Sequence, residues 1–245
     1  MTAAYRLALA GALGLCSAQT HAAFCADTYG GGSLVAEEGT TVCFVYDPAS
    51  VDPLFGTLSV SGDNIFATPT DFKALSENTD GAVIVSGTGT IQVITKPGWT
   101  LDGISVGEVG DYRMTSGASS VDVDGYLRVF DWLDPTPVFG TEETTNLAVS
   151  GDLSIKDGNN HNWSATGGFD LTTSAWDGRD NVGLTLQNTL SAVSNLAGES
   201  AMIQKKAVGS EITVSVDTSP VPLPAAAWLF LSGLLGFGTI GRRRG

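Results

Sequence analysis

The chain has 245 residues, a formal net charge of −14 and 31 glycines, and only 16% of its residues are charged. Typical proteins have about 25% charged residues and about 7% glycine, so this composition favours a glycine-turned β protein over a helical bundle. Residues 24–219 hold all 26 acidic residues and 8 of the 12 basic ones, which gives that segment a charge of 8 − 26 = −18. Such an acidic segment lacks the basic surface that nucleic-acid binding requires, so we exclude nucleic acid as a partner.

The first 23 residues are typical of a secretory signal peptide. Arg6 precedes a short apolar stretch, and small residues follow at Ala22 and Ala23, after either of which we expect cleavage. The apolar stretch is too short for a stable membrane span. Cys16 raises the alternative of a lipoprotein signal, but the leucine directly before it is a poor residue for such a site. The pattern therefore predicts export of the chain that follows.

Two cysteines, Cys25 and Cys43, remain after cleavage. An even pair in an exported chain is most simply a disulfide. It would close a loop of about 18 residues and stabilise the fold by about 3 kcal/mol in the chain-entropy model. The alternative is a reactive or metal-binding pair of thiols. Because no histidine lies nearby and the spacing matches no zinc pattern, we expect a disulfide, no metal and no other cofactor.

Residues 24–216 alternate apolar and polar side chains with period two, which is the pattern of half-buried strands. Asp-Gly pairs interrupt the alternation and favour tight hairpin turns. Many short strands with frequent turns predict an all-β ectodomain, a jelly-roll-like β-sandwich of two antiparallel sheets. The Asp-Gly pairs begin at Asp80, Asp102, Asp124, Asp157 and Asp177, and the alternating apolar residues are Val42, Phe44, Tyr46, Ile91, Val93, Ile104, Val106, Val121, Val123, Leu127, Val129, Leu147, Val149, Leu153, Ile155, Val182, Leu184, Leu186, Ile212, Val214 and Val216.

Three segments depart from this pattern. Residues 191–201 are the best internal helix candidate, one or two turns long. Residues 131–145 contain two prolines and a glycine and predict a long loop within one domain. Residues 217–224 predict a linker, because Pro222 and Pro224 keep the residues before them extended.

Two motifs with catalytic associations are incomplete. Residues 103–107 match G-x-S-x-G, but no helical pattern follows them, so we interpret Ser105 as lying on the polar face of a strand. His161 is the one histidine left after signal cleavage, and it lies in a polar segment rich in turn formers, where we expect an exposed loop residue. The 26 acids offer many carboxylate pairs for a glycosidase, and the sequence selects none. We therefore expect the chain not to be an enzyme.

Two weaker patterns point to ligands. Asp122 and Asp124 resemble the start of a calcium loop, but a further ligand position and the closing glutamate are missing. We expect both aspartates to face solvent from one side of a strand, with weak calcium binding elsewhere left open. Six aromatic residues could stack on sugars, although core or turn packing is the simpler role for most of them. They are Trp99, Tyr112, Tyr126, Trp132, Trp163 and Trp176.

The end of the chain carries the most specific pattern. Residues 225–241 contain no charged side chain. About 17 residues of helix span about 25 Å, near the lower limit for crossing a bilayer. Arg242, Arg243 and Arg244 follow at once and favour a cytoplasmic C-terminus. We expect residues 225–245 to form a C-terminal transmembrane helix with a cytoplasmic basic cluster, and an ordinary membrane anchor is the alternative to a sorting signal.

A short proline-containing motif, Val221, Pro222, Leu223, Pro224 and Ala225, stands directly before this helix. The order of motif, apolar helix and arginine cluster over residues 221–245 closely resembles the VPLPA variant of the PEP-CTERM sorting signals. The resemblance implies that a bacterial exosortase is the partner that processes the tail. It also implies an intermediate anchored in the inner membrane and a destination at the cell surface or in the extracellular matrix.

These patterns together predict three parts: a signal peptide over residues 1–23, an ectodomain over residues 24–216, and a sorting tail after a linker. The ectodomain shows no complete catalytic motif, so we expect a non-enzymatic structural or interaction role. The alternative is a module that binds extracellular polysaccharide. An enzyme acting on polysaccharide is a third hypothesis, and it would require two carboxylates that converge in an aromatic-lined cleft.

Overall fold

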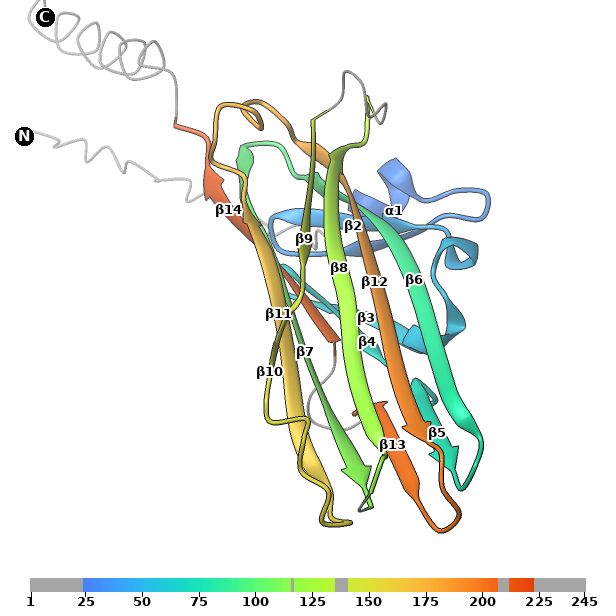
Figure 1. Ribbon diagram of the computed structural model, residues 1–245. Helices are drawn as coiled ribbons and strands as arrows, with labels where there is room; N and C mark the ends of the chain where they lie inside the picture. Colours follow the sequence, from blue (N-terminus) through green and yellow to red (C-terminus); the bar gives the residue numbers. More distant parts are fainter. Residues whose placement is uncertain (1–23, 116, 135–140, 207–211, 223–245) are drawn as a thin grey trace, which may run out of the picture.

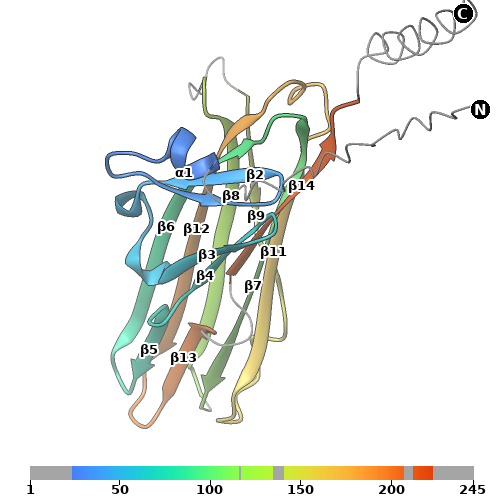
Figure 2. The same cartoon turned by 180° about the vertical axis from the view of Figure 1, so that it is seen from behind.

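The computed structural model describes residues 24–115, 117–134, 141–206 and 212–222. Two antiparallel β-sheets lie face to face with the core between them, and the views in Figures 1 and 2 show the two layers from opposite sides. This confirms the all-β, two-sheet prediction. The predicted signal peptide, Leu223 to Ala225 of the motif, the C-terminal helix and Arg242 to Arg244 lie outside the described residues. No helix among the described residues is long and apolar enough to span a bilayer.

The first sheet has six strands in the order β1-β2-β6-β12-β8-β9. Its centre is long, because β12 pairs along almost its whole length with β6 on one side and β8 on the other. A short helix, α1, lies beside the β1–β2 edge of this sheet (Figure 1). The bounds are α1 Phe24–Tyr29, β1 Val35–Glu38, β2 Val42–Tyr46, β6 Gly81–Thr95, β12 Asn181–Ser194, β8 Ser120–Asp131 and β9 Glu142–Asn146.

The second sheet has eight strands and is organised around β7. One edge of β7 pairs with β11, and its other edge is shared by β14 along the first half and β13 along the second half. Strand β4 pairs with β14, and β5 pairs with β13. The bounds are β3 Thr57–Ser61, β4 Asn64–Thr68, β5 Lys73–Glu77, β7 Trp99–Met114, β10 Ala148–Ser150, β11 His161–Asp170, β13 Ser200–Lys205 and β14 Ile212–Pro220, with short 3-10 turns η1 Pro48–Ser50 and η2 Pro53–Phe55 before β3.

The predicted alternation is clearest in β8. Val121 and Val123 are buried, while Asp122 and Asp124 between them are exposed. Period two puts successive side chains on opposite faces of a strand, so the valines enter the core and the aspartates face solvent. The prediction for the two aspartates is confirmed. The alternation fails farther along the chain, because Leu153 and Ile155 lie in no strand and Val149 is 37% exposed in β10.

Two of the predicted turns are wrong. Gly103 lies inside β7 and Gly125 lies inside β8. A Cβ atom at Gly125 would come 2.6 Å from the carbonyl oxygen of Gln187, and one at Gly103 would come 3.1 Å from that of Phe169. These glycines permit close approach of neighbouring strands rather than a turn. The glycines of the other three Asp-Gly pairs have positive φ: Gly158 and Gly178 lie in loops, and Gly81 begins β6 directly after a turn.

The helix predicted over residues 191–201 is also wrong. Strand β12 continues to Ser194, and β13 begins at Ser200 after a short turn. The backbone N–H of Ser194 donates to Ser76 Oγ at 2.9 Å, and the two serine hydroxyls lie 2.9 Å apart. Leu190 and Ala192 are fully buried with period two. Strand pairing on both edges of β12 outweighs the weak local preference for helix.

The boundary predicted at residue 216 lies too early. Strand β14 continues to Pro220, with a register shift between Asp217 and Thr218, so residues 217–220 belong to the sandwich. The predicted loop over residues 131–145 is shorter than expected, because β8 ends at 131 and β9 begins at 142. Residues 135–140 of that loop lie outside the described residues.

Candidate functional site at the tail end of the sandwich

Strand β14 ends at one end of the two sheets, directly before the predicted sorting motif, and we call this end the tail end. Val221 and Pro222 are the last described residues, and they follow β14 directly. The N–H of Val221 donates to the carbonyl oxygen of Gly98 at 2.9 Å. In Figure 1 the tail end is the upper end of the molecule, where β14 finishes close to the level of α1 and β2. The first two residues of the predicted motif are therefore positioned by the fold.

Side-chain contacts brace the last residues of β14. Ser219 Oγ lies 3.0 Å from the hydroxyl of Thr100 and donates to Asp102 Oδ1 at 3.0 Å. The hydroxyl of Thr218 lies 2.8 Å from that of Thr41, which follows β1. These hydroxyl pairs connect β14 with β7 in its own sheet and with the β1–β2 turn of the other sheet.

The disulfide lies at the same end. Cys25 in α1 and Cys43 in β2 are bonded, their Cα atoms are 5.5 Å apart, and both residues are fully buried. This bears out the expected pairing. Cys43 and Val45 pack against Ile94 in a small cluster separate from the main core, because they lie on the opposite face of β2 from Val42 and Phe44. Helix α1 covers this second face, which explains why β2 is buried on both sides.

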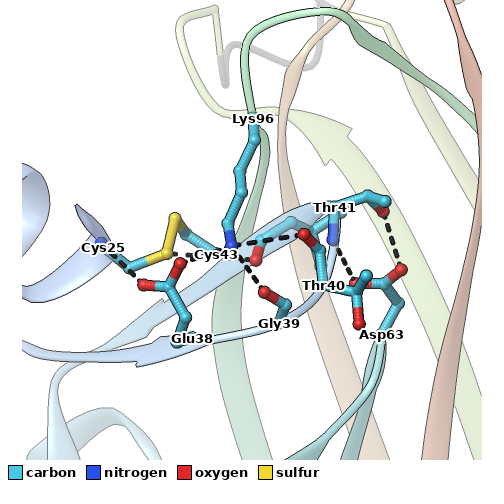
Figure 3. The surroundings of a disulfide bond; sticks show 9 residues. Cys25, Glu38, Gly39, Thr40, Thr41, Cys43, Asp63 and Lys96 are labelled. Carbon is cyan, nitrogen blue, oxygen red and sulfur yellow. Dashed lines mark hydrogen bonds and ion pairs between the residues drawn. A yellow bond between two sulfur atoms is a disulfide. The ribbon is translucent and has the colours of Figure 1, made fainter. Parts of the chain in front are cut away.

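An ion pair between Glu38 and Lys96 sits beside the disulfide (Figure 3). Glu38 also accepts the backbone N–H of Cys25 at 2.9 Å, and Lys96 Nζ donates to the carbonyl oxygen of Gly39 at 2.6 Å. The side chains are 13% and 22% exposed for Lys96 and Glu38, so water partly screens the pair. Its main effect is to hold the turn between β1 and β2 in place.

That turn is fixed from its other side by Asp63. The N–H and the hydroxyl of Thr41 each donate to one oxygen of the Asp63 carboxylate, both at 2.7 Å (Figure 3). Thr41 in turn contacts Thr218. A continuous set of bonds therefore runs from the disulfide through the β1–β2 turn to the strand that carries the tail.

Two adjoining hollows open at the tail end, and both are lined by residues 177–180 of the loop after β11. One also contains Trp99 and Asp102, and the other contains Asp131 and Leu133. Arg179 is ion-paired with Asp131 between them. The hollows offer carboxylates and one half-buried indole. Within the described ranges, no group of three or more His, Cys, Asp or Glu side chains is arranged to hold a metal ion.

The aromatic residues considered for sugar stacking divide between core and surface. Tyr112, Trp163 and Trp176 are buried, and the indole N–H of Trp176 donates to Glu143 at 2.6 Å. Core packing is thus confirmed for these three. Tyr126 and Trp99 are half-buried, while Trp132 is 39% exposed and stacks on Phe130 with ring centroids 5.9 Å apart.

The other candidate residues remain apart from one another. Ser105 is exposed within β7, and the strand continues past it, so no nucleophile elbow forms. His161 is the first residue of β11 rather than a loop residue, and its Nε2 lies 2.8 Å from Asp157 Oδ1. The bond from His161 and the N–H of Asn159 hold the pKa of Asp157 well below its usual value.

One group of buried polar residues has no counterpart among the sites predicted from the sequence. Glu108, Asn188 and Lys205 are buried in the middle of the sandwich, far along the strands from the tail end. A signal was present in β13, where Lys205 has the same phase as the buried Ala201 and Ile203. Charged residues are almost never fully buried without a partner, so a lysine in a core phase predicts a buried acid.

Comparisons with known proteins do not assign a family. No protein-family model matches the chain. No curated protein matches it. Among solved structures, the chain is similar to the infectious bursal disease virus Gx strain structure, with TM-score 0.26 and 11% identity over 67% of this chain and 42% of that one. It is also similar to the Gt strain structure, with TM-score 0.23 and 12% identity over 80% of this chain and 56% of that one. The VP2 subviral particle of the same virus gives TM-score 0.22 and 14% identity over 76% of this chain and 52% of that one.

The chain thus spans about half the length of the viral chains that it matches. All three TM-scores lie well below 0.5.

Proposed function

We propose that the protein is an exported, exosortase-processed protein of the cell surface or extracellular matrix, with a structural, non-enzymatic ectodomain. The observation that carries this proposal is the buried disulfide between Cys25 and Cys43, which follows directly on the predicted cleavage sites. Disulfides persist in oxidising compartments and are rare in the cytosol. The bond therefore supports export, as the signal sequence and the sorting tail require.

The placement of the tail supports a structural role. The motif begins immediately after β14, which is hydrogen-bonded to β7 and β4 and braced at its end by Thr41. A load on the tail would pass straight into paired strands rather than into a long flexible linker. We also propose that the sandwich is jelly-roll-like, that a signal helix precedes it and that a C-terminal transmembrane helix follows it.

Deletion of the exosortase in the native host tests the sorting proposal. We expect the deletion strain to retain the C-terminal tail and to keep the protein in the inner membrane, as measured by C-terminal mass spectrometry and fractionation. The double variant Pro222→Ala/Pro224→Ala should behave in the same way. Pro220→Ala, a proline outside the motif, is the matched control and should be processed normally. An unchanged C-terminus and location in the deletion strain would refute the proposal.

A second candidate function is binding of extracellular polysaccharide, and the hollow beside Trp99 and Asp102 favours it. A half-buried indole next to carboxylates offers both a stacking surface and hydrogen-bond acceptors for hydroxyl groups. Retention of the protein on native polysaccharide should fall with Trp99→Ala and stay unchanged with Tyr126→Ala, which alters a half-buried aromatic of β8 that lines neither hollow. Absence of retention for the unaltered protein would reject this function.

A further inference from the structure

Three polar side chains meet in the middle of the sandwich. Lys205 Nζ is ion-paired with Glu108 Oε2, and Asn188 Nδ2 donates to Glu108 Oε1 at 2.7 Å. The side chains of Glu108 and Lys205 are 0% exposed, and Asn188 is 0% exposed as a residue. Glu108 lies on β7 and Lys205 on β13 of the second sheet, while Asn188 lies on β12 of the first. One carboxylate therefore holds an amine and a primary amide from opposite sheets next to each other.

The surroundings of this group are apolar and aromatic. Lys205 Nζ lies 5.3 Å from the ring centroids of both Phe72 and Trp163. Replacing a buried ion pair with well-packed apolar side chains is often neutral or stabilising, so packing alone does not account for these residues. A chemical role for the group would account for them.

The neighbouring backbone leaves room for Asn188. In the strand register it stands between Gly87 of β6 and Gly125 of β8. A Cβ atom at Gly125 would come 3.0 Å from Asn188 Oδ1, and one at Gly87 would come 3.1 Å from the ring of Phe72. Glycine at position 125 therefore keeps a side chain away from the amide, and glycine at position 87 leaves room for the Phe72 ring beside Lys205.

Burial favours the neutral form of the Lys205 amine. Removal from water lowers the pKa of Lys205, and Glu108 opposes this only in part. Transfer of the proton from Lys205 to Glu108 replaces two buried charges with a neutral amine and a neutral acid. A neutral amine is a nucleophile, as the desolvated lysines of enzymes show.

The oxygen of the Asn188 amide is not satisfied by a hydrogen bond within the described part of the chain. Asn188 Oδ1 is buried and has no hydrogen-bond partner among the described residues. A half-turn about the Cβ–Cγ bond exchanges the amide oxygen and nitrogen, which places Oδ1 against Glu108. A protonated Glu108 then donates to Oδ1 and draws electron density away from the Asn188 carbonyl carbon.

We propose that Lys205 and Asn188 become joined by an intramolecular isopeptide bond, with Glu108 as the catalytic residue that transfers the protons. Lys205 Nζ attacks Cγ of Asn188, and a new Nζ–Cγ bond forms as the carbonyl electrons move to Oδ1. Glu108 donates its proton to Oδ1 and accepts one from Nζ. It then returns a proton to Nδ2, the Cγ–Nδ2 bond breaks, and ammonia leaves while the Oδ1 proton returns to Glu108. No oxidant, reductant or cofactor enters the balance.

The product is a covalent bridge between the two sheets. It joins β12 to β13 across the core, and it leaves Glu108 neutral and hydrogen-bonded instead of charged. Formation of the bond requires only the three side chains and their surroundings, so it does not depend on the proposed surface location.

Cleavage at Glu199 provides the test, because Glu199 lies between Asn188 and Lys205 in the sequence. The full chain is purified, denatured, reduced and digested with a glutamate-specific protease, and the fragments are measured by mass spectrometry. We expect residues 144–199 and 200–211 to stay joined, with a mass equal to the sum of the two fragment masses minus one ammonia molecule. The joined product should carry two N-termini, at Thr144 and Ser200, which separates it from an uncleaved, deamidated fragment of the same mass. Separate fragments at their sequence masses would overturn the proposal. So would loss of ammonia with separate fragments, which indicates a succinimide at Asn188.

Single-residue variants test the role of each of the three side chains in forming the bond. Lys205→Arg, Asn188→Ala and Glu108→Gln should each give separate fragments. Lys206→Arg is the matched control, because Lys206 is the adjacent lysine and bonds to Asn162 rather than to the buried group, and its fragments should stay joined. Joined fragments in Glu108→Gln would refute the role of Glu108. The measurement on the unaltered chain decides whether the bond exists even if a variant does not fold.

Discussion

Different kinds of interaction stabilise the tail end and the middle of the sandwich. At the tail end, a disulfide and a partly exposed ion pair secure α1 and the β1–β2 turn on one edge of a sheet. In the middle, a fully buried ion pair and an asparagine connect the two sheets through the core. The disulfide at the tail end depends on the redox state of the compartment, and the buried group in the middle does not. Each can therefore be broken without the other.

The largest effect is expected from loss of one member of the buried pair. Lys205→Met removes both the amine that the proposed bridge requires and the partner of the buried Glu108, and removing one partner of a buried pair lowers the free energy of unfolding by about 3–5 kcal/mol. Denaturant unfolding monitored by tryptophan fluorescence measures it. The double variant Glu108→Leu/Lys205→Met removes the uncompensated charge and should recover that part of the loss, while the part that comes from the missing bridge remains. A single variant as stable as the unaltered protein would contradict the central role given to this pair.

Removal of the disulfide should have the next largest effect. The double variant Cys25→Ser/Cys43→Ser loses a cross-link over 18 residues, and the chain-entropy model predicts about 3 kcal/mol lower stability. Thermal unfolding with and without a reductant measures it. The unaltered protein should fall to the level of the variant on reduction, while the variant should not respond. If reduction left the unaltered protein unchanged, the disulfide would have no stabilising role.

A packing change in β7 should have an intermediate effect. A Cβ atom at Gly110 would come 2.3 Å from both the Trp163 ring and the carbonyl oxygen of Gln204. Gly110→Ala should therefore cost about 1–3 kcal/mol, as overpacking does. Gly107→Ala in the same strand meets no atom within 4 Å and is the matched control, with little change expected. Equal denaturation midpoints for the two variants would contradict the close approach at Trp163.

The ion pair beside the disulfide should matter much less. Lys96→Met removes the partner of Glu38, and partly exposed pairs contribute about 0–1 kcal/mol. Chemical denaturation in low and high salt measures the change, and salt should reduce it further. A loss as large as that of Lys205→Met would mean that exposure does not separate the two pairs.

The smallest effect concerns Asp157. Its pKa is lowered in the folded state, so its contribution to stability is complete above the unfolded pKa and is lost as the pH falls through the folded pKa. That window lies below the usual aspartate value of about 4. His161→Gln removes the first cause, so the Asp157 carboxyl should titrate at higher pH, as followed by NMR. An unmoved titration would contradict the contact with His161.

The sequence predicted what depends on local alternation. The valines and aspartates of β8, the core phase of β14 and the disulfide all follow from period two or from pairing of cysteines. It did not predict features set by distant neighbours. Gly125 has the same local sequence signal as a turn glycine, and only Gln187 on the adjacent strand shows why it is needed. Glu108 and Lys205 lie 97 residues apart, and the local sequence around either residue does not identify the other as its partner.

The position of β14 also has a consequence for the order of folding. The β3–β4 hairpin joins its sheet through pairing with β14, yet it is synthesised far earlier than β14. Until residue 220 is available, β4 and the first half of β7 present unpaired edges that invite pairing with other chains. The sheet thus closes late, after a long-range contact that is slow to form. Closure of the domain and placement of Val221 and Pro222 are then one event, so a molecule that holds these two residues in place has already completed its fold.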